Sequence, residues 1–137
     1  MYVPGHTLTV RLSGGTQPNE GRVEVYFNNT WGTICDNSWD IYDANTVCRT
    51  LGYSYALLAR RSSYYGEGSG PIWLDNVQCT GRENSIGECY HSVWGVHSSY
   101  CNHKRDAGVV CLGELTCDFG LFMNYFELCD NVVFLGN

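Results

Sequence analysis

The chain has 137 residues, eight cysteines and a formal net charge of −6. This length suffices for one domain with a short appendage. Eight cysteines among so few charged residues are typical of a disulfide-dense extracellular domain and argue against a cytosolic enzyme. Because the chain is acidic, we expect neither nucleic acid nor an anionic membrane to be a general partner.

The first third of the chain predicts strands. Residues 7–12 and 22–27 alternate apolar and polar side chains, as half-buried strands do. Asn28 and Asn29 can form the tight turn of a hairpin that leads into a third strand. Apolar runs predict further strands at residues 72–77 and 107–112.

One helix is predicted between these strands. Residues 41–51 place apolar side chains at helical spacing, with Cys48 on the apolar stripe. Asp43 suits the first turn or the N-cap, and Gly52 suits a left-handed C-terminus. Strands around a single helix make the predicted fold class α+β. The bulky apolar residues expected to supplement the core are Trp31, Trp39, Trp73 and Trp94.

Six motifs follow one another along the chain. They are Gly21-Arg-Val-Glu-Val-Tyr, Trp31-Gly-Thr-Ile-Cys-Asp, Asp43-Ala-x3-Cys48-Arg-x-Leu-Gly, Gly68-Ser-Gly-Pro-Ile-Trp-Leu-Asp75-x-Val-x-Cys79, Glu88-Cys89 and Asp106-Ala-Gly-Val-Val-Cys111. Over about residues 8–112 this series resembles the scavenger receptor cysteine-rich (SRCR) domain. The resemblance implies a curved antiparallel sheet that cradles one helix. We therefore expect an SRCR domain at residues 7–113 and a tail at residues 114–137.

The eight cysteines alone leave the disulfide pairing open. The family's eight-cysteine form has cysteines where this chain has Asn19 and Tyr53, so the chain resembles the six-cysteine form. The pairs that this resemblance implies are Cys35–Cys101, Cys48–Cys111 and Cys79–Cys89. In the tail, Cys117 and Cys129 lie outside the match. We expect them to pair with each other, the alternative being a partner chain.

The resemblance also implies a divalent-cation site made by three acidic residues. Its positions hold Asp36, Asn37 and Arg105 in this chain. Because two of the three carboxylates are replaced, we expect a weak or degenerate site, in which Arg105 pairs with Asp36. Asp75 and Asn76 are the candidates for a second, weaker site. We expect no required cofactor, and Ca²⁺ bound weakly at most.

Two basic pairs, Arg60-Arg61 and Lys104-Arg105, have two interpretations. They are solvated surface charges, or they form a patch whose arginine forks bind phosphate, sulfate or carboxylate groups. Four tyrosines near the first pair suit carbohydrate stacking, a protein interface, or packing under loops. These tyrosines are Tyr53, Tyr55, Tyr64 and Tyr65. Separately, Asn28 begins an N-x-[ST] sequon at the predicted hairpin tip, so we expect a glycan there.

Two catalytic alternatives have weaker support. Residues 79–103 contain six possible zinc ligands, but their spacing does not match that of common zinc sites. They are Cys79, Cys89, His91, His97, Cys101 and His103. The sequence also lacks a Gly-x-Ser-x-Gly nucleophile motif, so we expect no enzyme.

The remaining features concern the context of the domain. Residues 114–137 are unusually apolar and predict a segment packed back on the domain or the stub of a following module. Neither a signal peptide nor a membrane span is evident, so we expect a piece of a larger secreted or surface protein. We expect a non-enzymatic extracellular module that recognises host proteins or polyanionic microbial surfaces. The alternatives are a structural or adhesion spacer and a zinc-dependent hydrolase.

Overall fold

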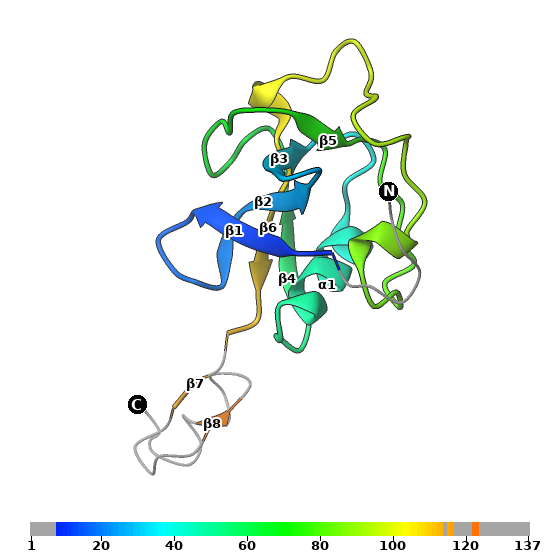
Figure 1. The fold of residues 1–137 in the computed structure, drawn as a ribbon. Coiled ribbons are helices and arrows are strands. Elements are labelled where there is room, and N and C mark those ends of the chain that lie inside the picture. Colours follow the sequence, from blue (N-terminus) through cyan, green and yellow to red (C-terminus); the bar gives the residue numbers. More distant parts are fainter. Residues whose placement is uncertain (1–7, 114, 117–121, 124–137) are drawn as a thin grey trace.

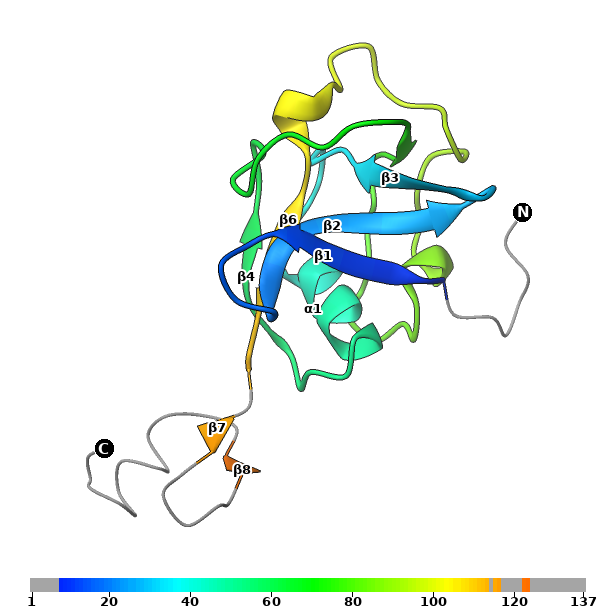
Figure 2. The ribbon, with the colours of Figure 1, turned by 60° about the vertical axis from the view of Figure 1, so that its left-hand side comes forward.

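The computed structural model describes residues 8–113, 115–116 and 122–123. Its central strand is β2 (Glu20–Phe27), which pairs with three neighbours (Figures 1 and 2). These antiparallel partners are β1 (Val10–Gly14), β3 (Thr30–Ile34) and β6 (Gly108–Cys111). Because β6 pairs with residues 20–22 and β3 with residues 24–27, β2 carries different partners along its length and the sheet curls around it.

The edges of the sheet differ from the prediction. The strand order is β4-β6-β2-β3-β5, with β4 (Ala56–Arg60) and β5 (Ile72–Leu74) at its ends. The expected all-antiparallel sheet is wrong at β5, which runs parallel to β3. A parallel pair needs a long crossover, and here the chain passes through a helix and β4 before it reaches β5. The sequence does not predict β4, because its side chains do not alternate between buried and exposed. The register shifts after Ala56, and the consecutive residues Leu57 and Leu58 are both exposed.

The helix α1 (Ile41–Thr50) lies where the sequence predicts it. Its N-cap is Asp40, whose carboxylate accepts from the backbone N–H of Asp43, while the carboxylate of Asp43 accepts from the N–H of Asp40. Asp43 therefore lies in the first turn of the helix, which is one of the two positions predicted for it. Gly52 has a φ of +97°, which confirms the left-handed end of the helix.

The core lies between α1 and the inner face of the sheet. Its fully buried apolar residues include Val23, Val25, Ile34, Trp39, Val47, Leu74 and Val109. Trp39 donates its indole N–H to the carbonyl of Gly108 at 2.9 Å, so its one polar group is satisfied. Trp73 and Trp94 pack against this core, but Trp31 does not belong to it and stacks under Arg11. Ile41 is also exposed, so the apolar stripe of the helix begins at Ala44.

Three disulfides hold these elements together. They join Cys35 to Cys101, Cys48 to Cys111 and Cys79 to Cys89, which are the pairs that the resemblance implied. The second links α1 to β6, so helix and sheet are tied through the core. The predicted pair of Cys117 and Cys129 lies outside the described residues.

The shorter elements complete the chain. Two 3₁₀ turns, η1 (Ile86–Glu88) and η2 (His103–Arg105), lie between β5 and β6. Beyond the domain, β7 (Leu115–Thr116) pairs with β8 (Phe122–Met123) in a separate two-stranded sheet. The role predicted for residues 114–137 stays a prediction. Within the described ranges, none of the helices has the length and apolarity that crossing a bilayer requires.

Candidate functional site

A buried carboxylate joins the segments that carry the two basic pairs. Asp36 follows β3 and is 2% exposed. Its Oδ1 accepts from Nε of Arg105 at 2.9 Å and from Nη2 at 2.8 Å. Its Oδ2 accepts from the backbone N–H of Ser62 at 2.7 Å. One side chain therefore binds both the residue after Arg61 and the residue after Lys104.

Backbone contacts reinforce this junction. Ser63 donates its N–H to the carbonyl of Asp106 at 3.1 Å, and Asp106 donates its N–H to Oγ of Ser63 at 2.9 Å. In the sheet, Arg60 at the end of β4 pairs with Gly108 of β6. The two basic pairs, which are far apart in sequence, thus meet at one end of the sheet. We call Arg60, Arg61, Lys104 and Arg105 the basic corner.

Aromatic rings lie against two of these cations. The guanidinium of Arg60 lies 3.9 Å from the ring centre of Tyr64, and that of Arg105 lies 4.9 Å from that of Tyr100. Tyr64 and Tyr100 are 60% and 51% exposed, so both rings border solvent. Sequence reasoning does not single out Tyr100, although its place beside Cys101 and four residues before Lys104 is a usable signal.

The other two cations face solvent. Arg61 is exposed and donates Nε–H to the carbonyl of Trp39 at 2.8 Å, while Lys104 is exposed on η2. Of the remaining predicted tyrosines, Tyr53 packs against the core and Tyr55 is exposed ahead of β4. The corner thus combines guanidinium groups held by hydrogen bonds or aromatic rings, one exposed ammonium and aromatic faces, a set that suits anionic ligands with apolar or sugar surfaces.

The residues at Asp36 do not fit a calcium ion. Calcium needs six to eight oxygen ligands and gains affinity from their negative charge. Here both oxygens of Asp36 accept hydrogen bonds, and a guanidinium contacts the carboxylate. Asn37 adds no charge. The expected pairing of Arg105 with Asp36 is confirmed, and it neutralises the acid that a cation would require.

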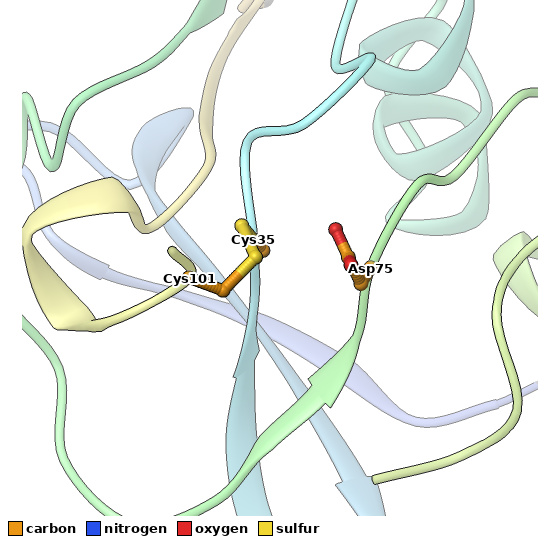
Figure 3. Close-up of side chains that lie close together, drawn as sticks. All are labelled: Cys35, Asp75 and Cys101. Atoms are coloured by element: carbon orange, nitrogen blue, oxygen red, sulfur yellow. A yellow bond between two sulfur atoms is a disulfide. The ribbon is translucent and has the colours of Figure 1, made fainter. Parts of the chain in front are cut away.

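The second candidate cation site offers little more. Asp75 lies beside the Cys35–Cys101 disulfide (Figure 3). Its Oδ2 accepts from N–H and Oγ of Ser98 at 2.8 and 2.9 Å, and its buried Oδ1 has no hydrogen-bond partner. The side-chain oxygen of Asn76 already accepts from Ser38 and Gln78. A weak site here stays a prediction.

The cysteine clusters do not fit zinc. Among the described residues, the two groups with metal-ligand proximity are Cys35 with Asp75 and Cys101, and Cys79 with Glu83 and Cys89. In both groups the two sulfurs form a disulfide with each other. Zinc binds the thiolate, which a disulfide sulfur cannot supply, so neither group suits a zinc-dependent hydrolase.

Comparison with known proteins decides the family. The family model described as the scavenger receptor cysteine-rich domain matches residues 13–112. The chain belongs to the SRCR family. SRCR domains are non-enzymatic modules, and this domain is not an enzyme.

Curated relatives place the SRCR domain in larger proteins. The chain is 52% identical over 103 residues to the macrophage scavenger receptor types I and II of Mus musculus, which covers 75% of this chain and 22% of that protein. It is 50% identical over 105 residues to the galectin-3-binding protein of Pongo abelii, covering 77% and 18%. The chain thus spans about a fifth of the length of these relatives. In them the SRCR domain is extracellular.

Solved structures confirm the fold. The third SRCR domain of murine neurotrypsin matches with a TM-score of 0.69 at 45% identity, covering 76% of this chain and 95% of that one. The SRCR domain of mouse MARCO, solved in a dimeric form, matches with a TM-score of 0.62 at 56% identity, covering 74% and 93%. The predicted α+β class with one main helix is therefore confirmed.

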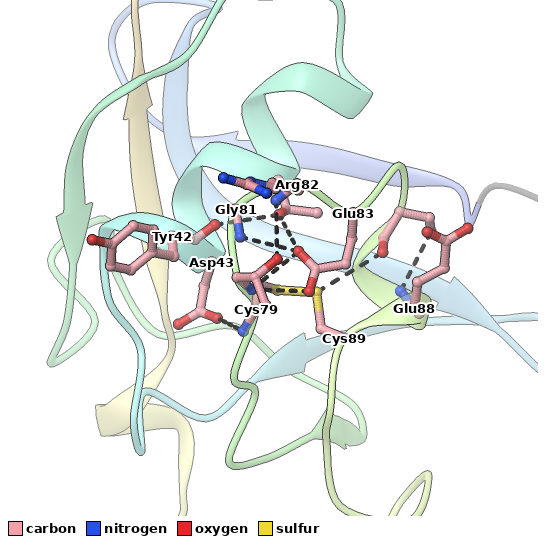
Figure 4. The surroundings of a disulfide bond; sticks show 12 residues. Tyr42, Asp43, Cys79, Gly81, Arg82, Glu83, Glu88 and Cys89 are labelled. Carbon is pink, nitrogen blue, oxygen red and sulfur yellow. Dashed lines mark hydrogen bonds between the residues drawn. A yellow bond between two sulfur atoms is a disulfide. The ribbon is translucent and has the colours of Figure 1, made fainter.

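A second carboxylate–arginine network holds the loop of the Cys79–Cys89 disulfide on α1 (Figure 4). Glu83 accepts from the backbone N–H groups of Thr80 and Gly81, while Arg49 of α1 donates to the carbonyls of Gly81 and Glu83. Partial burial acts to raise the pKa of Glu83, but these backbone N–H donors outweigh it and the pKa is lowered. We call Arg49, Glu83, Cys79 and Cys89 the disulfide clamp.

Asp43 connects this clamp to the helix cap. Its Oδ1 accepts from the backbone N–H of Cys79 at 2.7 Å, and its Oδ2 accepts from Asp40. Burial raises the pKa of Asp43 to about 7, with the two N–H donors acting in the opposite direction. These contacts stay inside the protein, so Asp43 positions structure and does not meet a ligand.

The sequon lies at an exposed turn of the SRCR domain. Asn28 and Asn29 have φ values of +50° and +64°, which confirms the tight hairpin between β2 and β3. Asn28 is exposed, so its side chain is accessible to a glycosyltransferase. The glycan itself stays a prediction.

Proposed function

We propose that this SRCR domain recognises polyanionic ligands, on microbial surfaces or on host proteins, through its basic corner and without calcium. The observation that supports this most is the junction at Asp36, which gathers both basic pairs on one side of an acidic molecule. The relatives' roles as a scavenger receptor and a binding protein agree with recognition as the task.

The charges define the expected ligand. The net charge of −6 repels anions at long range, so attraction must come from the corner itself. At physiological salt, screening acts over about 8 Å, so binding should fall steeply as salt rises. Arginine forks favour sulfate, phosphate and carboxylate groups, and the exposed rings of Tyr64 and Tyr100 favour a sugar or peptide backbone between those groups.

The test uses dextran sulfate as a probe and compares substitutions that remove equal charge. Arg61→Ala and Lys104→Ala remove exposed cations from the corner, and Arg82→Ala removes an exposed arginine outside it. We expect the first two to weaken binding about three- to tenfold each, as loss of one good ionic contact does. Arg82→Ala should leave binding unchanged.

Equal losses of affinity in all three variants would show that the probe responds to overall charge and not to a site, which would contradict the proposal. Unchanged binding in Arg61→Ala and Lys104→Ala would also overturn it. Arg60→Ala, Arg61→Ala is a stronger double variant. It also removes the stack on Tyr64, so its folding is checked by urea unfolding.

A second candidate function is an adhesion or spacer module between neighbouring domains. It is favoured by three exposed apolar side chains on the loop before Cys101, which are those of Tyr90, Val93 and Val96. Val93 is 72% exposed. Probe binding that is absent in the parent chain, together with contacts only to other domains or copies, would favour this function. For both functions we propose an extracellular setting, in a parent protein that is secreted or held at the cell surface.

A further inference from the structure

His103 begins the turn η2 that carries Lys104 and Arg105, and acceptors face both of its ring nitrogens. Nδ1 lies 3.0 and 3.1 Å from the two carboxylate oxygens of Asp106, and Nε2 lies 2.9 Å from the carbonyl of Gly70. A neutral imidazole has one N–H and one lone pair. Since neither a carboxylate nor a carbonyl can donate, this geometry favours the doubly protonated ring, which donates from both nitrogens.

The protonated ring closes a loop onto the basic corner. Asp106 is buried, and its Oδ2 also accepts from the backbone N–H of Gly68 at 2.7 Å. The loop at residues 66–71 is thus attached to η2 at two points, one through Asp106 and one through His103. Ser63, which follows the first basic pair, donates its hydroxyl to the carbonyl of His103. The ring therefore lies between the loop and both halves of the corner.

We propose that His103 is a proton-controlled clamp that sets the affinity of the basic corner for anions, an inference that rests on the proposed function. When the ring is protonated, it adds a positive charge beside Lys104 and holds residues 66–71 on η2. When the proton leaves, one ring nitrogen carries a lone pair that faces Gly70 or Asp106, so one of the two hydrogen bonds of the ring is lost. The ligand class is the sulfated or phosphorylated polymer of the proposed function.

The charges around the ring agree with this direction. The groups that act on the ring are Asp106 in its own segment and Glu67 in the loop, and the hydroxyl of Thr33 lies 3.5 Å from Nδ1. Arg22 of β2 borders Gly68 together with Asp106. Partial burial acts to lower the pKa of His103, but the Gly70 carbonyl and the Asp106 carboxylate outweigh it and the pKa is raised. Affinity should therefore be highest below this pKa and fall as the pH rises through it.

The test measures dextran sulfate binding at constant salt between about pH 5.5 and 8.5, an interval that extends roughly one unit or more on each side of an ordinary histidine pKa. In the parent chain we expect a loss of about three- to tenfold on raising the pH, since a bound anion shifts a neighbouring pKa by about half a unit to one unit. His103→Gln should flatten this profile. His97→Gln, which changes an exposed histidine of the same long loop, should keep it.

A second readout follows the ring directly. Nuclear magnetic resonance of the parent chain should show His103 losing its proton above the ordinary histidine range, with the amide signals of Gly68 and Gly70 moving at the same pH. A neutral ring at pH 6, or a parent-like pH profile in His103→Gln, would overturn the clamp. If the parent chain binds no probe at any pH, the proposed function fails, and the ring titration still decides whether His103 holds the loop.

Discussion

The basic corner and the disulfide clamp use the same chemistry for different ends. Each has an arginine and a carboxylate near a disulfide. Asp36 follows Cys35 and accepts from one backbone N–H, while Glu83 lies close to Cys79 and Cys89 and accepts from two. In the clamp, Arg49 donates to the backbone carbonyls of Gly81 and Glu83 and so holds their loop on α1. In the corner, Arg105 pairs with Asp36 and remains 38% exposed. The guanidinium of Arg49 is thus used within the loop, while part of the guanidinium of Arg105 borders solvent.

Removal of a disulfide should have the largest effect on the free energy of unfolding. The loss should be larger beside the corner than in the clamp. Cys35–Cys101 beside the corner spans 66 residues, while Cys79–Cys89 in the clamp spans 10. Loop entropy predicts a loss of about 4 kcal/mol for the Cys35→Ala, Cys101→Ala variant and about 3 kcal/mol for Cys79→Ala, Cys89→Ala. Urea unfolding measures both. The reverse order would mean that loop length does not govern these staples.

Isosteric substitution of the two carboxylates should separate the regions further. Asp36→Asn leaves Arg105 without its counter-charge, and we expect a loss of about 2 kcal/mol after allowance for the exposure of the guanidinium. Glu83→Gln keeps one acceptor for the N–H groups of the loop, so we expect about 1 kcal/mol. Equal losses, measured by urea unfolding with unchanged m-values, would contradict the distinction drawn between corner and clamp.

A glycan at Asn28 should have the smallest effect on either region. The hairpin tip is exposed, so we expect a change in unfolding free energy within about 0.5 kcal/mol. Expression in a eukaryotic secretory host should add mass that a glycosidase removes. Asn28→Gln should abolish this added mass, and an unchanged mass in that variant would show that the sequon is not used.

Much of the fold follows from local patterns in the sequence. The alternating strands, the stripe of α1 and the Asn28-Asn29 turn all depend on neighbours in the chain, and the structure has each of them. The edge strand β4 and the parallel pairing of β5 depend on contacts with distant residues. A local pattern does not encode those contacts, so the resemblance to a family supplied the sheet and the disulfide pairing.

The candidate site shows the same division. The sequence indicated two basic pairs and the pairing of Arg105 with Asp36, because the family's motif aligns these positions. It did not show that Ser62 and Arg105 share one carboxylate, or that Tyr100 lies against a guanidinium. The attachment of His103 to Gly70, across 33 residues, was equally outside any local signal. These contacts arise only when the loops meet in the folded chain.

We propose that Arg105 takes the place of a bound cation, so that the corner binds anions without calcium. The most direct measurement is the affinity for dextran sulfate in EDTA and in millimolar calcium, the weak end of extracellular calcium sites. We predict equal affinities for the parent chain, and calcium binding by calorimetry only after Asn37→Asp with Arg105→Glu restores the acids. Probe binding that requires calcium in the parent chain, and that Asp36→Ala abolishes, would contradict the account.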